Sequence, residues 1–90
     1  MVRYDDPVEV RTGTGGQEGP AQFLWRGRLW KVKEVLERRS QELPRRELWR
    51  VAAGRGRLDQ GGRPADVFEL AHDLRVGRWQ LLGAGSGVGE

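Results

Sequence analysis

Residues 21–33 read AQFLWRGRLWKVK and decide the fold class of this chain. Phe23 and Trp25 lie two residues apart, which is the spacing that places side chains on one face of a β-strand. The dipeptide Arg26-Gly27 follows them, and a dipeptide ending in glycine between two aromatic-rich runs is typical of a tight hairpin turn. The stretch therefore predicts two antiparallel strands joined by a two-residue turn.

The second strand of this hairpin carries two kinds of side chain in alternation. Trp30 and Val32 share one face, whereas Lys31 and Lys33 share the other. Because an indole on the face opposite two lysines is expected to point inward, we expect the Trp30 ring to serve the core.

The alternation breaks at Val35, which indicates a bulge in a strand that continues to about Glu37. A short helix over residues 34–43 is the alternative, because Val32, Val35 and Leu36 also match helical spacing. The strand is the favoured interpretation, and the sequence leaves both open.

Further runs with period-two spacing complete the predicted fold, and they are Val8–Arg11 (interpreted as an edge strand), Glu47–Ala53, Asp66–Asp73 and Arg78–Leu82. We expect a mostly β fold of five to six antiparallel strands in meander order. Such a meander forms a curled sheet or a small open barrel of the SH3-like or OB-like size. The predicted core consists of Phe23, Trp25, Trp30, Val32, Trp49, Val51, Phe68, Leu70, Trp79 and Leu81. We expect one domain over residues 1–82 and a flexible, glycine-rich tail over residues 83–90.

Composition limits the classes of protein to which the chain can belong. Ninety residues suffice for one domain, and the absence of cysteine excludes disulfides and cysteine-ligated zinc. A single histidine excludes a histidine-rich metal cage, so we expect no cofactor. No apolar run approaches the roughly 18–20 residues that span a bilayer, and the first residues lack a signal-peptide pattern. We therefore expect a cytoplasmic protein without a membrane partner.

Catalytic patterns are weak in this sequence. His72-Asp73 is the one pair suited to acid–base chemistry, but the few hydroxyl-bearing residues fall mostly in expected loops or tails. We expect His72 to be half-buried and bonded to a backbone group near a turn. The acidic residues lack the spacing of a calcium-binding loop, and the terminal glycines lack the residues that complete a phosphate-binding loop. The sequence thus favours a non-enzymatic protein.

Basic and aromatic residues cluster between residues 25 and 63. The chain holds 16 basic and 13 acidic residues, a net charge of +3. Single-strand-binding modules combine a basic groove with aromatic rings on which bases stack. We therefore expect contacts with single-stranded nucleic acid from Arg26, Arg28, Lys31, Lys33, Arg50, Arg55, Arg57 and Arg63. An ordinary core with solvated charges is the alternative interpretation, and a protein-interaction module that uses an exposed sheet edge is the alternative function.

Three segments carry a resemblance to a known family. They are PAQFLWRGRLWKV at residues 20–32, WRV at residues 49–51, and VFELAHD with GRWQL at residues 67–73 and 77–81. They resemble a small, uncharacterised family of bacterial β-domains, found mainly in actinobacteria, in which tyrosine is usual where this chain has Trp30. Such domains occur alone or appended to proteins similar to Y-family DNA polymerases of mutagenesis cassettes. The resemblance implies a β-domain with a link to DNA repair, and a DNA-polymerase-like protein as a partner. It supplies no catalytic residues.

Overall fold

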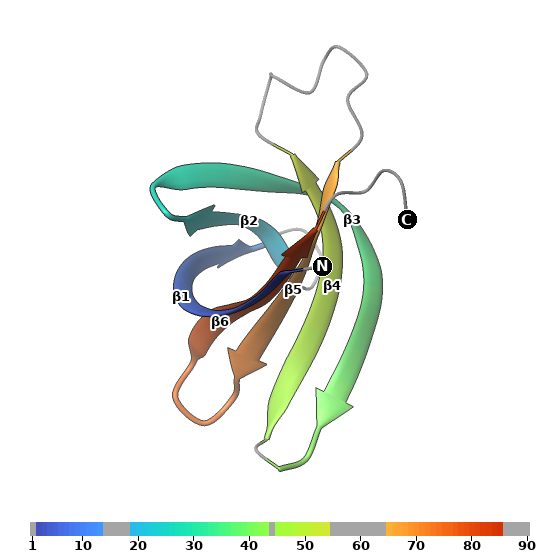
Figure 1. Cartoon of the computed structure of the whole chain (residues 1–90). Coiled ribbons are helices and arrows are strands. Elements are labelled where there is room, and N and C mark those ends of the chain that lie inside the picture. Colours follow the sequence, from blue (N-terminus) through green and yellow to red (C-terminus); the bar gives the residue numbers. More distant parts are fainter. Residues whose placement is uncertain (1, 14–18, 44, 55–64, 86–90) are drawn as a thin grey trace.

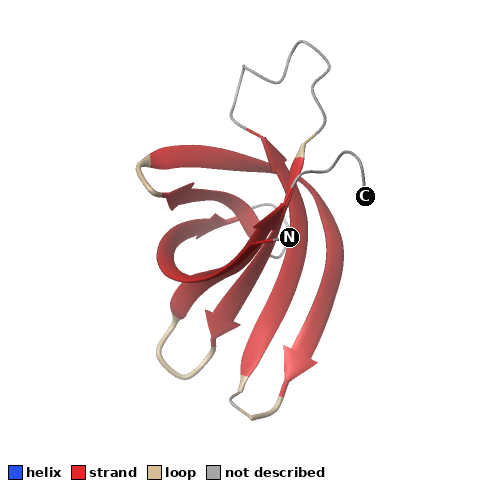
Figure 2. Cartoon of the chain, viewed as in Figure 1, coloured by secondary structure: helices blue, strands red, loops and turns tan. Residues whose placement is uncertain are grey.

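Six antiparallel strands follow one another along the chain and close into a barrel (Figures 1 and 2). The computed structural model describes residues 2–13, 19–43, 45–54 and 65–85. These residues contain no helix, and hence none long and apolar enough to cross a membrane. The strands are β1 (Val2–Thr12), β2 (Pro20–Trp25), β3 (Arg28–Gln41), β4 (Arg46–Gly54), β5 (Asp66–Asp73) and β6 (Arg78–Gly85). The predicted meander of antiparallel strands is confirmed.

Strand β1 closes the barrel because it pairs with two strands. Its first part pairs with β6, with Val8 opposite Trp79 as the last pair, and its second part pairs with β2. Figure 1 shows the strong curl that this exchange of partners requires. The interpretation of Val8–Arg11 as an edge strand is therefore wrong, because this segment lies where β1 passes from one neighbour to the other.

Strand β3 also changes partners, and bulges make this possible. Its start pairs with β2, from Arg28 to Lys31, and the remainder pairs with β4. The register with β4 shifts between Val32 and Glu34 and again between Val35 and Glu37. The bulge expected near Glu34 is thus confirmed.

The alternative helix over residues 34–43 is wrong, because β3 continues to Gln41. Each bulge adds a residue to the strand and moves the next inward side chain one place along. Val32 and Val35 both lie opposite inward residues of β4, although they are three residues apart. The bulge between Val32 and Val35 therefore produced a three-residue spacing that also suits a helix.

The two tight turns expected from glycine positions are confirmed. Arg26 and Gly27 have φ of 52° and 75°, so both residues of the β2–β3 turn adopt left-handed backbone, as hairpin turns of type I′ require. Gly77 has a φ of 73° at the end of the β5–β6 turn. Left-handed backbone is costly for arginine, which implies that other contacts hold Arg26 in place.

The predicted core is found inside the barrel. Phe68 lies at its centre, with its ring centroid 5.1 Å from that of Phe23 and 4.7 Å from that of Trp30. Trp25, Val32 and Trp79 are partly buried and pack against the fully buried set. That set comprises Phe23, Trp30, Trp49, Val51, Ala53, Phe68, Leu70 and Leu81, of which only Ala53 was not anticipated.

Strand β6 continues to Gly85, beyond the domain boundary predicted at residue 82. Gly83 lies opposite Arg3 of β1 and Glu69 of β5, and Ala84 packs against the core. Composition suggested a tail here because glycine weakens strands. Pairing on both sides provides the order that side chains do not. The predicted loops fall largely on residues 14–18 and 55–64, which lie outside the described residues, as do residues 86–90 of the predicted tail.

Candidate nucleic-acid interface

Arg26, the first of the predicted site residues, belongs to a cluster at one end of the barrel. Its Nε donates to Asp6 at 3.2 Å, and the Trp25 Nε1 donates to the same carboxylate oxygen at 2.9 Å. The Arg26 guanidinium lies 4.8 Å from the ring centroid of Tyr4 and 5.0 Å from that of Trp25. These contacts offset the left-handed backbone of Arg26 and give its side chain a structural role.

The other cations of the hairpin lie on the exterior of β3. Arg28, Lys31 and Lys33 are all exposed, and Lys31 lies opposite Gly54, the last described residue of β4. The indoles of this hairpin do not accompany them, because Trp30 is buried and Trp25 packs on the core. The hairpin therefore presents cations without aromatic surfaces. Arg55, Arg57 and Arg63 lie outside the described residues.

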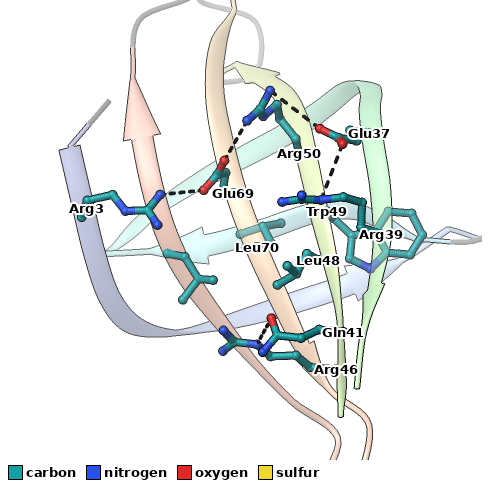
Figure 3. Close-up of a pocket in the computed structure, with 11 residues that line it drawn as sticks. Arg3, Glu37, Arg39, Gln41, Arg46, Leu48, Trp49, Arg50, Glu69 and Leu70 are labelled. Atoms are coloured by element: carbon teal, nitrogen blue, oxygen red, sulfur yellow. Dashed lines mark hydrogen bonds and ion pairs between the residues drawn. The ribbon is translucent and has the colours of Figure 1, made fainter. Parts of the chain in front are cut away.

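Of the predicted site residues that the structure describes, Arg50 is the one that lies among other arginines. It projects from β4 on the outer face of the barrel, since its neighbours Trp49 and Val51 are buried. Side chains from β1, β3, β4, β5 and β6 surround a cleft of about 190 Å³ there (Figure 3). We call this site the arginine cleft, and its outward side chains are Arg3, Glu37, Arg39, Gln41, Arg46, Leu48, Arg50, Glu69 and Leu82.

The arginine cleft has an excess of positive charge over an apolar base. Four guanidinium groups face two carboxylates, which leaves a net charge of +2 among these side chains. Leu48 and Leu82 are half-buried and add apolar surface. Arg46 differs from the other three arginines because its Nε donates to the Gln41 amide oxygen, at 3.2 Å, rather than to a carboxylate. Guanidinium groups at a cleft suit planar, bidentate contacts to phosphate.

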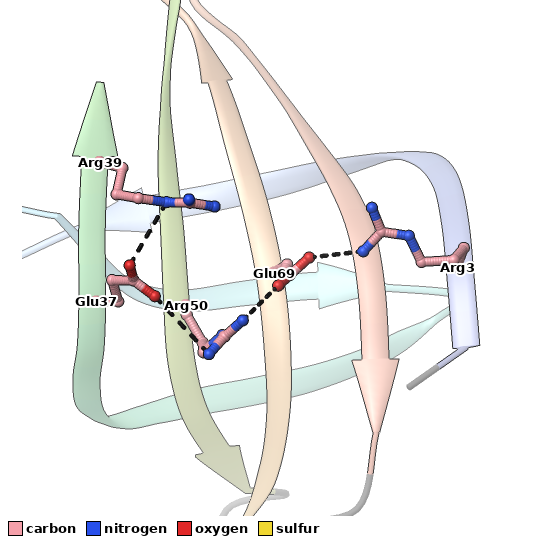
Figure 4. Close-up of polar contacts among 5 residues, drawn as sticks. All are labelled: Arg3, Glu37, Arg39, Arg50 and Glu69. Atoms are coloured by element: carbon pink, nitrogen blue, oxygen red, sulfur yellow. Dashed lines mark hydrogen bonds and ion pairs between the residues drawn. The ribbon is translucent and has the colours of Figure 1, made fainter. Parts of the chain in front are cut away.

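Ion pairs cross four strands at the edge of this cleft (Figure 4). Glu69 lies between Arg3 and Arg50, with N–O distances of 3.0 Å to each. Glu37 lies between Arg50 and Arg39, at 3.7 Å and 3.5 Å. Each partly exposed pair contributes only about 0.2–1 kcal/mol to stability, so the row positions the guanidinium groups more than it stabilises the fold.

The Glu69 carboxyl group responds electrostatically to these neighbours. Partial burial is the largest single influence and raises its pKa, but the hydrogen bonds from Arg50 and Arg3 and the positive charges of both arginines together outweigh it. The pKa of Glu69 is therefore lowered from its ordinary value of 4.5. Glu69 consequently stays ionised at neutral pH and keeps both arginines aligned along the cleft.

Alternation along β4 contained part of the signal for this site. Arg46 and Arg50 each lie two residues from Leu48, so the spacing places all three on the face opposite Trp49. Arg46 was nevertheless not among the predicted site residues. Arg3 and Arg39 were missed altogether. Their positions depend on the register of β1 with β6 and on the bulges of β3, which local spacing does not reveal.

His72 and Asp73 make separate contacts in the structure. The His72 ring stacks on that of Trp79, with centroids 4.2 Å apart and planes 3° apart, so its partner is an indole instead of the expected backbone group. Asp73 accepts the backbone N–H of Arg75 at 2.9 Å and stabilises the β5–β6 turn. Among the described residues, no group of three or more His, Asp or Glu side chains is arranged to hold a metal ion.

Comparison with known proteins places the chain in a family. Residues 1–84 match the model of a family described as a domain of unknown function, DUF6504. The chain belongs to the DUF6504 family. No curated protein and no solved structure matches it. The match covers all six strands almost completely, so the barrel and the arginine cleft both fall within the family domain.

Proposed function

We propose that this DUF6504 chain is a non-enzymatic accessory module that binds single-stranded nucleic acid through the arginine cleft. The observation that carries the proposal is the gathering of four arginines around one cleft from three strands of the barrel, namely Arg3 of β1, Arg39 of β3, and Arg46 and Arg50 of β4. Phosphate contacts dominate the affinity of nucleic-acid binders, and arginine makes them bidentate. The net charge of +3 is modest, so this local excess of positive charge has to supply the attraction.

Two double variants with matched charge test this proposal. Arg39→Ala with Arg46→Ala removes two cations from the cleft, whereas Arg28→Ala with Lys31→Ala removes two from the hairpin that the sequence favoured. Fluorescence anisotropy with a labelled single-stranded oligonucleotide measures affinity at low and high salt. We expect the first pair to weaken binding at least tenfold and the second to have a smaller effect. Absence of binding by the native chain at low salt contradicts the proposal.

A place in DNA repair is the biological setting we infer for this activity. Support comes from the resemblance of residues 20–32, 49–51 and 67–81 to domains appended to DNA-polymerase-like mutagenesis proteins. In this setting the module holds unpaired template next to the polymerase-like protein. Loss of binding to a primer–template with a single-stranded overhang, but not to a blunt duplex, is the expected effect of the cleft variants in anisotropy. Equal loss on both substrates contradicts this setting.

Protein interaction through an open strand edge is the second candidate function. In the described chain, β4 is the strand that pairs with Glu34–Glu37 of β3, and we infer that the other edge of this short segment accepts an added strand. Val35 and Leu36 on this segment are 41% and 44% exposed. We expect Leu36→Asp to abolish co-purification with a polymerase-like partner in the presence of nuclease. Unchanged co-purification argues against this edge.

A further inference from the structure

The inner face of the sheet continues past the core and forms a shelf at one end of the barrel. The last core row contains Trp49, Leu70 and Leu81, which lie opposite one another on β4, β5 and β6. The next row along the same face contains Ser40, Glu47, His72 and Trp79, which are again successive register partners on β3 to β6. Figure 1 shows the two hairpins, β3–β4 and β5–β6, projecting together at this end.

A shallow cleft of about 290 Å³ lies on this shelf. Thr12, Gly13 and Gly19 line it from the ends of β1 and β2. The shelf side chains Arg38, Glu47, Trp49, His72 and Trp79 complete the lining, and we call the whole site the aromatic shelf. A site at the mouth of a β-barrel is a common location for a small bound group.

Aromatic surfaces dominate the aromatic shelf. The parallel stack of His72 on Trp79 presents two flat rings from β5 and β6. The Arg38 guanidinium lies 4.7 Å from the Trp49 ring centroid and adds a planar cation from β3. Flat rings and guanidinium planes are the surfaces on which unpaired bases stack.

The polar groups of the aromatic shelf select an uncharged ligand. Arg38 donates to Glu47 at 2.7 Å, so the two charges on the shelf balance each other. A charged ligand would therefore gain little net attraction, in contrast to the arginine cleft. An N–H donor and a carboxylate acceptor side by side match the edge of a nucleobase, which carries both donors and acceptors.

The arginine cleft and the aromatic shelf occupy opposite faces of the same β3–β4 hairpin. Adjacent residues on a strand point to opposite faces, so Arg39 faces the cleft while Arg38 faces the shelf, and Arg46 and Glu47 are divided in the same way. The open edge of β3 lies between the two faces. A single strand that passes this edge has phosphates near one site and a base near the other.

We propose that the aromatic shelf binds one unpaired nucleobase by stacking and edge contacts, while the arginine cleft holds the adjoining phosphates. This inference rests on the proposed function and sharpens it, because it limits the ligand to nucleic acid with unpaired bases. A base inside a duplex is already stacked and paired, so it does not enter the shelf.

An abasic oligonucleotide separates base binding from phosphate binding. We compare an oligothymidylate of about 12 nucleotides with an abasic oligonucleotide of the same length, using the full chain and anisotropy. Stacking on one base corresponds to roughly a fivefold to hundredfold gain in affinity. We expect the native chain to prefer oligothymidylate by at least fivefold, and His72→Ala to lose that preference. His72→Phe, which keeps a flat ring against Trp79, is expected to retain most of it.

The outcomes distinguish the inference from the function on which it rests. Equal binding of both oligonucleotides by the native chain refutes base binding by the aromatic shelf but agrees with phosphate binding by the arginine cleft. Binding of neither refutes both proposals. Glu47→Gln is a second variant of the shelf. If the folded His72→Ala and Glu47→Gln variants keep the preference for oligothymidylate, the base binds elsewhere, and this result also refutes base binding by the aromatic shelf. Arg11→Ala is the control, because Arg11 is exposed on β1, lies opposite Gln22 and lines neither site, and it is expected to keep the preference. Circular dichroism confirms that each variant is folded.

Discussion

Replacement of Arg46 by alanine is the perturbation that reports most cleanly on the arginine cleft. Its side chain donates to the Gln41 amide oxygen, so its removal leaves no described carboxylate unpaired. Each phosphate contact with a single strand contributes about −0.7 to the slope of log affinity against log salt. Contacts from four arginines therefore predict a slope of about −2.8, and Arg46→Ala predicts about −2.1. Between about 50 and about 200 mM salt, affinity then falls roughly 50-fold for the native chain and roughly 20-fold for the variant.

Fluorescence anisotropy with a labelled oligothymidylate, titrated at four or more salt concentrations, measures both slopes. Arg11→Ala is the matched control, because Arg11 is exposed on β1 and lies opposite Gln22, outside the cleft. We expect its slope to equal that of the native chain. A native slope near zero, or equal changes of slope for Arg46→Ala and Arg11→Ala, refutes the assignment of phosphate contacts to the cleft.

Three further predictions concern stability. Gly19→Ala places a Cβ 2.5 Å from Cζ3 of Trp49 at a φ of +102°. We expect urea unfolding to show a free energy of unfolding lower by roughly 2–4 kcal/mol. An unchanged midpoint would mean that Gly19 and Trp49 are not in contact. Trp25→Phe removes the hydrogen bond to Asp6 and should cost about 1 kcal/mol in the same assay, whereas no loss would show that this bond contributes nothing. Glu69→Gln should flatten the pH dependence of stability: the pKa of Glu69 is lowered in the fold, so its contribution is complete above the ordinary pKa of 4.5 and is lost as pH falls through the folded value. Identical acid unfolding of native and Glu69→Gln chains would contradict this.

Local spacing predicted most of the fold because the strands carry their pattern in adjacent residues. Asp66–Asp73 is β5 with the bounds expected, and the turn at Arg26-Gly27 follows from one glycine. Closure of the barrel was not predicted, because it depends on β1 exchanging β6 for β2. The ambiguity over residues 34–43 had a similar cause, since a bulge changes the spacing of a strand without changing its class.

The candidate site was harder to predict than the fold. The hairpin of residues 25–33 joins cations and indoles in the sequence, but the Trp30 indole serves the core, as expected, and Arg26 belongs to a structural cluster. Arg3 and Glu69 are 66 residues apart and meet only through register. Residues on different strands that share a face are the ones that sequence alone did not bring together.

Binding of single-stranded nucleic acid by the arginine cleft is tested most directly by NMR. The isotopically labelled chain is titrated with oligothymidylate, and the backbone and arginine side-chain signals are followed. We expect chemical-shift changes to concentrate on Arg39, Arg46 and Arg50 of the cleft, with smaller changes at His72. Changes confined to Arg28 and the rest of the β2–β3 hairpin, or no changes at low salt, would contradict binding by the cleft.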